Sequence, residues 1–90
     1  MRERKDADVL ALEALAWVLA EPDLAAAWME ASGLDPVSLR ARAGETEVLA
    51  AVLDFLLSSD ALVTGFASAA GIAPEAVARA RRALPGGEWA

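Results

Sequence analysis

Helix start and stop signals divide this sequence into six short segments, and their spacing limits the fold more than any other feature of the chain. Proline, serine, threonine or an acidic residue opens most segments, because these residues suit the unbonded N–H groups at the start of a helix. Glycine closes three segments, at Gly33, Gly44 and Gly71, which is typical of the residue that follows a helix. The predicted helices run from residue 7 to 20, from 21–23 to 33, from 35–36 to 44, from 46 to 57, from 58–60 to 71, and from 73–75 to 84.

The composition favours helices over strands. Alanine fills 23 of the 90 positions and is the best helix former, whereas tyrosine is absent and isoleucine and threonine are scarce. Hydrophobic residues make up 57% of the chain, so a domain of this length has ample material for a core. The sequence therefore predicts an all-α fold, a compact bundle of about six short helices in one domain over residues 1–90, with tails at 1–6 and 85–90.

The two halves of the chain resemble each other at a spacing of 38 residues. Large apolar residues, aromatic residues, a glycine and a proline recur in the same order without a gap. This pattern predicts two pseudo-equivalent three-helix halves that pack together about a pseudo-two-fold axis, because neither half could bury its apolar face alone. The alternative is that any chain of this helix–Gly–Pro–helix type looks self-similar. The matching positions are Leu15, Trp17 and Leu19 with Leu53, Phe55 and Leu57, Leu24 and Trp28 with Leu62 and Phe66, and 33–39 with 71–77.

The absence of cysteine and histidine removes most of the side chains used in catalysis and metal binding. Asparagine, glutamine and tyrosine are absent as well. Most carboxylates stand at predicted helix starts, where they stabilise the positive end of the helix dipole. We therefore expect no enzyme, no cofactor and no metal site. A carboxylate- and arginine-based metal- or phosphate-binding protein is the remote alternative.

The charge and hydropathy pattern predicts a cytoplasmic protein. A formal net charge of −6 opposes nucleic-acid binding, which depends on a basic surface. The longest apolar stretch, residues 9–20, is interrupted by Glu13 and is shorter than the roughly 20 residues of a membrane span. Acidic residues within and before this stretch also do not fit a signal peptide. We expect neither a nucleic acid nor a membrane as partner.

Arginines form two clusters, Arg40 with Arg42 and Arg79 with Arg81 and Arg82. Each lies in the last turn of a predicted helix, where cations complement the negative end of the dipole. Ordinary helix termini with surface ion pairs explain them. Alternatively, the pseudo-two-fold would bring the two clusters into one basic patch for a phosphate or an acidic partner.

Two further features concern contacts with a partner. Trp89 follows a Pro-Gly-Gly segment near the chain end, and it either folds back, contacts another chain or is disordered. Ala61, Gly65 and Ala69 form a stripe of small residues that allows close approach of a helix, from this chain or from a second copy.

Two acids lie inside apolar helices. Asp54 is predicted to be a solvated boundary residue, with an ion pair to an arginine and a functional role as alternatives. The same alternatives apply to Glu13.

The segment Leu53-Asp54-Phe55-Leu56-Leu57, with the Ser59-Asp60 start and the later Phe66, Gly71 and Pro74, resembles a small bacterial family catalogued as domain of unknown function 3572. Segments 21–23 and 33–36 share the resemblance, which covers about residues 11–84. The chain departs from the family pattern at Ser59-Asp60, where an acidic pair is usual, and at Trp28-Met29, where Phe-Leu is usual. The resemblance implies a helical fold and carries over no functional residue.

These observations favour a non-enzymatic helical protein-interaction module. A self-associating structural protein, a homodimer built on the Ala61, Gly65 and Ala69 stripe, is the alternative.

Overall fold

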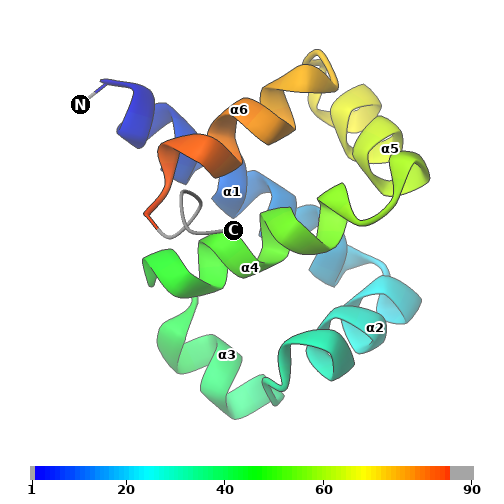
Figure 1. Ribbon diagram of the computed structural model, residues 1–90. Helices are drawn as coiled ribbons and strands as arrows, with labels where there is room; N and C mark the ends of the chain where they lie inside the picture. Colours follow the sequence, from blue (N-terminus) through cyan, green and yellow to red (C-terminus); the bar gives the residue numbers. More distant parts are fainter. Residues whose placement is uncertain (1, 86–90) are drawn as a thin grey trace.

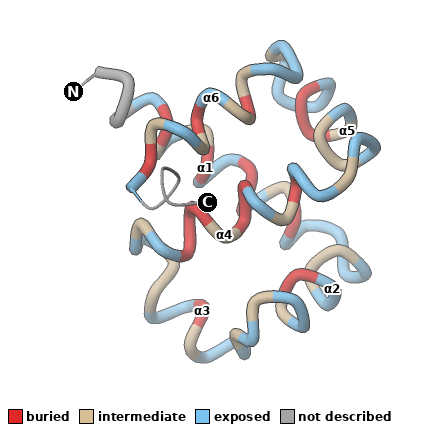
Figure 2. The backbone as a smooth tube through the Cα atoms, in the orientation of Figure 1, coloured by how far each residue is buried: buried red, intermediate tan, exposed pale blue. Residues whose placement is uncertain are grey.

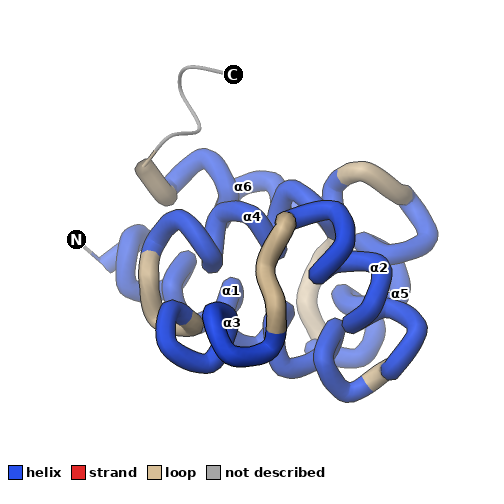
Figure 3. The backbone as a smooth tube through the Cα atoms, turned by 90° about the horizontal axis from the view of Figure 1, so that it is seen from below, coloured by secondary structure: helices blue, strands red, loops and turns tan. Residues whose placement is uncertain are grey.

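Residues 2–85 of this computed structural model form six α-helices and no strand, which confirms the predicted all-α class (Figures 1 and 3). Side chains are described from Asp6 to Pro85, so Trp89 lies outside the described residues. The helices are α1 (Arg2–Ala20), α2 (Pro22–Ser32), α3 (Pro36–Arg42), α4 (Thr46–Leu57), α5 (Asp60–Ala70) and α6 (Glu75–Ala83).

The helix ends follow the local signals of the sequence. Gly33 and Gly71 end α2 and α5 with φ of 78° and 71°, a left-handed conformation that side chains disfavour. At the start of α3, the backbone N–H of Ser38 donates to Asp35 Oδ1 at 2.7 Å. One boundary was wrong: α1 begins at Arg2 rather than at residue 7, so residues 2–6 are not a tail. Arginine, glutamate and lysine are good helix formers, and they continue the helix toward the N-terminus.

Helices α1 and α4 form the centre of the molecule. They pack against each other, α2 and α5 lie along their flanks, and α6 lies across both (Figure 1). A hydrophobic cluster unites buried side chains from all six helices, and buried residues concentrate on the facing sides of α1 and α4 (Figure 2). The core therefore runs between the two halves that the sequence repeat defines.

The burial pattern repeats with the same spacing of 38 residues as the sequence. The α1–α2 contact has its counterpart in α4–α5, and the α2–α4 contact has its counterpart in α1–α5. These four helices therefore obey the predicted pseudo-two-fold. The pairs of buried residues are Ala11 and Leu49, Ala14 and Val52, Leu15 and Leu53, Val18 and Leu56, Trp28 and Phe66, and Leu39 and Val77.

The third helix of each half breaks this symmetry. Helix α6 packs extensively on both α1 and α4, whereas α3 makes no comparably extensive contact with any described helix. The sequence explains the difference, because the α6 segment buries Val77, Ala80 and Leu84 while α3 buries only Leu39. The two halves thus share two helices of common geometry and differ in the third.

We expect Trp28→Phe to destabilise the protein far less than Trp28→Ala. Trp28 is 1% exposed, and its indole Nε1 has no hydrogen-bond acceptor among the described residues. Phenylalanine removes this unsatisfied donor and already fills the equivalent position as Phe66. Urea unfolding should give a loss below about 1.5 kcal/mol for phenylalanine and about 3–5 kcal/mol for alanine. Equal losses of stability for the two variants would contradict the description of the Trp28 indole N–H as a buried donor without an acceptor.

The cap of α3 predicts a pH dependence of stability. The hydrogen bond from the Ser38 backbone lowers the pKa of the Asp35 carboxyl below its ordinary value of 3.8. A lowered pKa means that the ionised cap stabilises the fold above that ordinary value and loses its effect as the pH falls through the folded-state pKa. The Tm difference between the wild type and Asp35→Ala should therefore shrink in acid, to what a neutral acceptor oxygen at this position supplies.

The matched control is Asp35→Asn, which keeps an acceptor oxygen without titrating. Its Tm advantage over Asp35→Ala should persist at low pH in thermal unfolding followed by circular dichroism. A wild-type advantage over Asp35→Ala that keeps its full size at low pH would refute the role of the ionised carboxylate.

Candidate functional site

The outer face of α1 exposes a stripe of apolar side chains. Val9, Leu12 and Leu19 are 49%, 46% and 37% exposed, and Ala16 lies between them and is exposed as well. Their spacing of three, four and three residues places them on one side of the helix. The opposite side carries the buried residues Ala7, Ala11, Ala14, Leu15 and Val18. We call the exposed set, Val9, Leu12, Ala16 and Leu19, the α1 seam.

The equivalent face of α4 shows that the fold does not require apolar residues at the seam. With the repeat of 38, the seam positions correspond to Glu47, Ala50, Asp54 and Leu57. Glu47 and Asp54 are exposed and charged, and Ala50 is only 6% exposed. Leu57 alone is an exposed apolar residue, like its counterpart Leu19. The two central helices therefore bury the same inner face. They differ in the chemistry of the outer one and, at Ala50 and Leu12, in how far it is covered.

A shallow hollow between α1 and α5 adjoins the seam. Its volume is about 500 Å³, and an aromatic pair, Trp17 and Phe66, stands in it with ring centroids 5.8 Å apart and planes tilted by 59°. Ala16 belongs to both the seam and the hollow, so the two form one continuous surface. The hollow is lined by Glu13, Ala16, Trp17, Phe66, Ala69 and Ala70.

The predicted stripe of small residues lies on α5 beside this hollow. A Cβ at Gly65 would lie 3.3 Å from Trp17 Cζ2, so the group that approaches this glycine closely is the indole of the same chain. Ala69 lines the hollow, and Ala61 is exposed. Of the three residues, only Ala69 thus belongs to the surface formed with α1.

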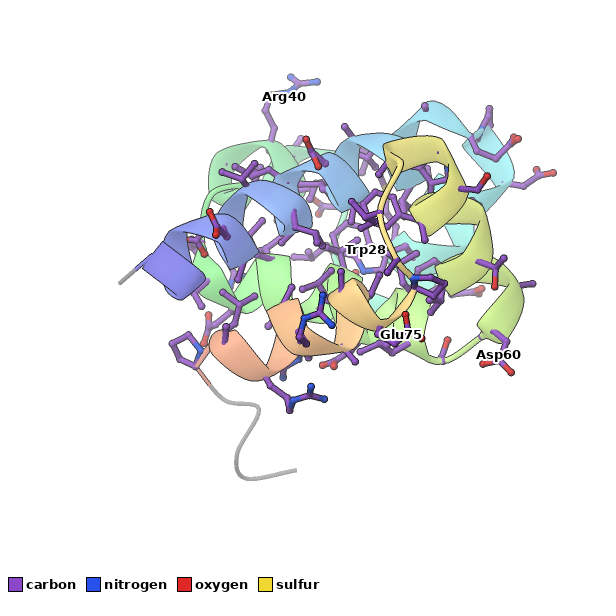
Figure 4. All side chains as sticks on the ribbon, turned by 90° about the horizontal axis from the view of Figure 1, so that it is seen from above. Trp28, Arg40, Asp60 and Glu75 are labelled. Atoms are coloured by element: carbon purple, nitrogen blue, oxygen red, sulfur yellow. The ribbon has the colours of Figure 1, made fainter. Side chains whose placement is uncertain are left out.

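The two arginine clusters do not form one basic patch. Helices α3 and α6 lie on opposite sides of α4 in the two perpendicular views (Figures 1 and 3). The joint patch, which the sequence left open as an alternative to ordinary helix termini, does not form, because the pseudo-two-fold fails for the third helices. Arg40 projects from α3 at the edge of the molecule opposite α6 (Figure 4).

Two of the five arginines in these clusters form ion pairs with carboxylates. Arg42 donates from Nε to Glu45 Oε1 at 2.8 Å and from Nη2 to Glu47 Oε1 at 3.1 Å. The hydrogen bond to Glu45 contributes most to raising the pKa of Arg42 above its usual value. Arg81 donates from Nε to Asp54 Oδ1 at 2.7 Å. Asp54 is thus both exposed and ion-paired, which combines two of the alternatives that the sequence left open.

The remaining arginines, Arg40, Arg79 and Arg82, form no ion pair within residues 6–85. Arg79 and Arg82 border a second hollow, of about 510 Å³, between α6 and the first turns of α1, and Asp6 borders it too. The carboxylate opposes anion binding there. Among the described residues, no group of three or more acidic side chains is arranged to hold a metal ion.

No single described helix is long and apolar enough to cross a membrane. Helices α4 and α5 reach the necessary length and hydropathy only together, across a bend of 113°.

Sequence reasoning missed the α1 seam. The helix is apolar on nearly every face, which indicates a fully buried central helix. The available signal was the comparison of the halves, since Val9 and Ala16 correspond to the acids Glu47 and Asp54. The acids on α4 indicate that these positions face solvent, so the apolar residues at the matching positions of α1 are candidates for exposure.

The Arg81–Asp54 ion pair gives a second stability prediction. The side chain of Arg81 is 12% exposed and that of Asp54 is 58% exposed, and Arg81 Nη1 is buried without a hydrogen-bond partner in the described structure. Asp54→Ala leaves this guanidinium without its acceptor and should cost about 1–3 kcal/mol. Arg81→Met keeps the apolar stem, removes the buried charge and should cost less than about 1 kcal/mol.

A double-mutant cycle isolates the interaction. In the Arg81→Met background, Asp54→Ala should be neutral or stabilising, because alanine is the better helix former. Urea unfolding of the four proteins measures this. An equal cost of Asp54→Ala in both backgrounds would show that the pair contributes nothing.

Comparison with known proteins identifies one family model along nearly the whole chain. The model described as "Protein of unknown function (DUF3572)" matches residues 4–87. No curated protein and no solved structure matches the chain. The match agrees with the residues that carry the resemblance in the sequence, and it assigns no activity.

Proposed function

For this chain, which belongs to the DUF3572 family of proteins of unknown function, we propose the role of a small, non-enzymatic helical module that binds another protein through the outer face of α1. The binding surface consists of the α1 seam and the adjoining hollow between α1 and α5. Exposed apolar residues on a helix that already buries its other side are typical of a contact site.

The single observation that carries the proposal is the contrast between the outer faces of α1 and α4. The fold accepts charged residues at these positions, as Glu47 and Asp54 demonstrate, and both acids make ion pairs with arginines of neighbouring helices. Val9 and Ala16 at the same positions gain nothing in the isolated chain, because water surrounds them. Coverage by a partner would remove their apolar surface from water at about 25 cal/mol per Å².

The inventory of side chains supports a non-enzymatic role. Without cysteine or histidine, the chain lacks the usual nucleophiles and general bases near neutral pH. The carboxylates that the sequence does offer act at helix ends, as Asp35 does, or pair with arginines, as Glu45, Glu47 and Asp54 do.

A homodimer through the Ala61, Gly65 and Ala69 stripe receives less support, because Gly65 is occupied by Trp17 of its own chain. The α1 seam offers the larger exposed apolar side chains.

Site-specific photocrosslinking in the native cell tests the proposed function. A photoreactive amino acid at position 12 should give a discrete crosslinked product with another protein, because Leu12 stands in the middle of the seam. The matched control is position 37 on α3, where Val37 is 76% exposed and apolar but lies on a helix outside the proposed surface. Products that are absent at position 12, or identical at both positions, would refute the proposal.

Charged variants of the seam supply the companion measurement. Val9→Glu and Ala16→Asp copy the residues of α4. Val9→Glu should change the free energy of unfolding by no more than about 0.5 kcal/mol, and Ala16→Asp should cost no more than about 1 kcal/mol, mainly through its lower helix propensity. Ala16→Asp should nevertheless suppress the crosslink from position 12. Leu15→Asp, which places a charge in the core at a 5% exposed position, should unfold the protein and marks the difference between the two faces.

A further inference from the structure

We propose that the natural occupant of the α1 seam is an amphipathic helix of a partner protein that carries lysine or arginine beside its apolar face. This inference rests on the proposed function and names the chemistry of the partner.

The register of the seam matches a helical partner. Val9, Leu12, Ala16 and Leu19 occupy positions a, d, a and d of a heptad, the spacing at which two helices interlock their side chains. The seam extends about 15 Å along α1, from residue 9 to residue 19, at about 1.5 Å per residue. A partner helix of about three turns would cover it.

The hollow supplies a place for a large side chain of the partner. Ala16 leaves a gap in the seam, and the gap opens toward the hollow that Trp17 and Phe66 line. A leucine, isoleucine or methionine of the partner could contact the half-buried ring of Trp17 there, while the buried Phe66 forms the floor of the hollow. Helix docking into an apolar groove uses such anchors at intervals of three and four residues.

The charges beside the seam select a basic partner. Asp6 and Glu13 are seven residues apart, both are exposed, and they lie on the same flank of α1. Neither has an ion pair within the described side chains. Asp6 shares its hollow with Arg79 and Arg82, so Glu13 supplies most of the unbalanced negative charge. Cations at flanking positions of a partner helix would pair with these acids and determine partner choice.

A second copy of the chain fits this surface poorly. In an antiparallel pair of α1 helices centred on the seam, the two Glu13 carboxylates would face each other on one flank. In a parallel pair, the helix dipoles would be aligned unfavourably. Each chain also carries a net charge of −6, which opposes self-association. A basic helix that docks antiparallel to α1 avoids all three conflicts.

The probe for the test is a fluorescent peptide of three heptads with leucine at a and d, lysine at e and g, and alanine elsewhere. Lysine at both flanking positions keeps the peptide from pairing with itself. Fluorescence anisotropy with the full-length protein should show binding that is lost with Leu12→Asp and unaffected by Leu57→Asp, the matched change on α4. A peptide with glutamate in place of lysine should bind at least about tenfold more weakly.

A charge-matched pair of protein variants separates specific pairing from general attraction to an acidic protein. Glu13→Lys should weaken binding of the lysine peptide by about tenfold or more and strengthen binding of the glutamate peptide. Glu30→Lys makes the same change of net charge on the exposed surface of α2, and it should alter binding by less than about threefold. Equal effects of the two variants would overturn the proposal.

Two other results would also overturn it. One is absence of binding by the lysine peptide. The other is a dimer, seen by light scattering at tens of micromolar, that Leu12→Asp dissociates, since this would assign the seam to a second copy. In either case, a crosslink from position 12 to a different protein would leave the proposed function standing, and its absence would remove both.

Discussion

The packing of α1 against α4 holds the other helices in place. Both helices bury one complete side, and six of the described residues with 0% exposure lie there: Ala11, Ala14 and Val18 on α1 and Val52, Leu53 and Leu56 on α4. Small side chains on α1 facing larger ones allow close approach of the helices without voids. The flanking helices then close the ends of this core with Trp28 from α2 and Phe66 from α5.

Because that core is pseudo-symmetric, the outer face of α4 serves as an internal reference for the outer face of α1. Because α1 and α4 bury equivalent residues, any difference between their outer faces reflects something other than the needs of the core. Helix α4 carries Glu47 and Asp54, which are paired with Arg42 and Arg81. Helix α1 carries Val9 and Ala16, which contact water. The asymmetry lends physical weight to an interaction role, which rests on no similarity to a protein of known activity.

Helix α6 is the element that turns a symmetric arrangement into an asymmetric molecule. By lying on both α1 and α4, it covers surface that α3 does not cover in the other half. Its Arg81 reaches Asp54 across 27 positions of sequence, whereas Arg42 pairs with acids only three and five residues away. This difference in range explains why the two arginine clusters, alike in sequence, have different surroundings and do not meet.

Local sequence is enough to predict the six helices and, apart from the start of α1, their ends, because these depend on neighbours a few residues apart. Gly33, Gly71 and Asp35 act where their local chemistry predicts, and the repeat of 38 residues predicted the shared burial of Trp28 and Phe66. Which apolar residues remain exposed depends instead on tertiary packing. Helix α1 is apolar on nearly all sides, so its periodicity cannot distinguish Leu15 in the core from Leu12 on the surface. That distinction, like the contact of Gly65 with Trp17, depends on which distant helix covers which face.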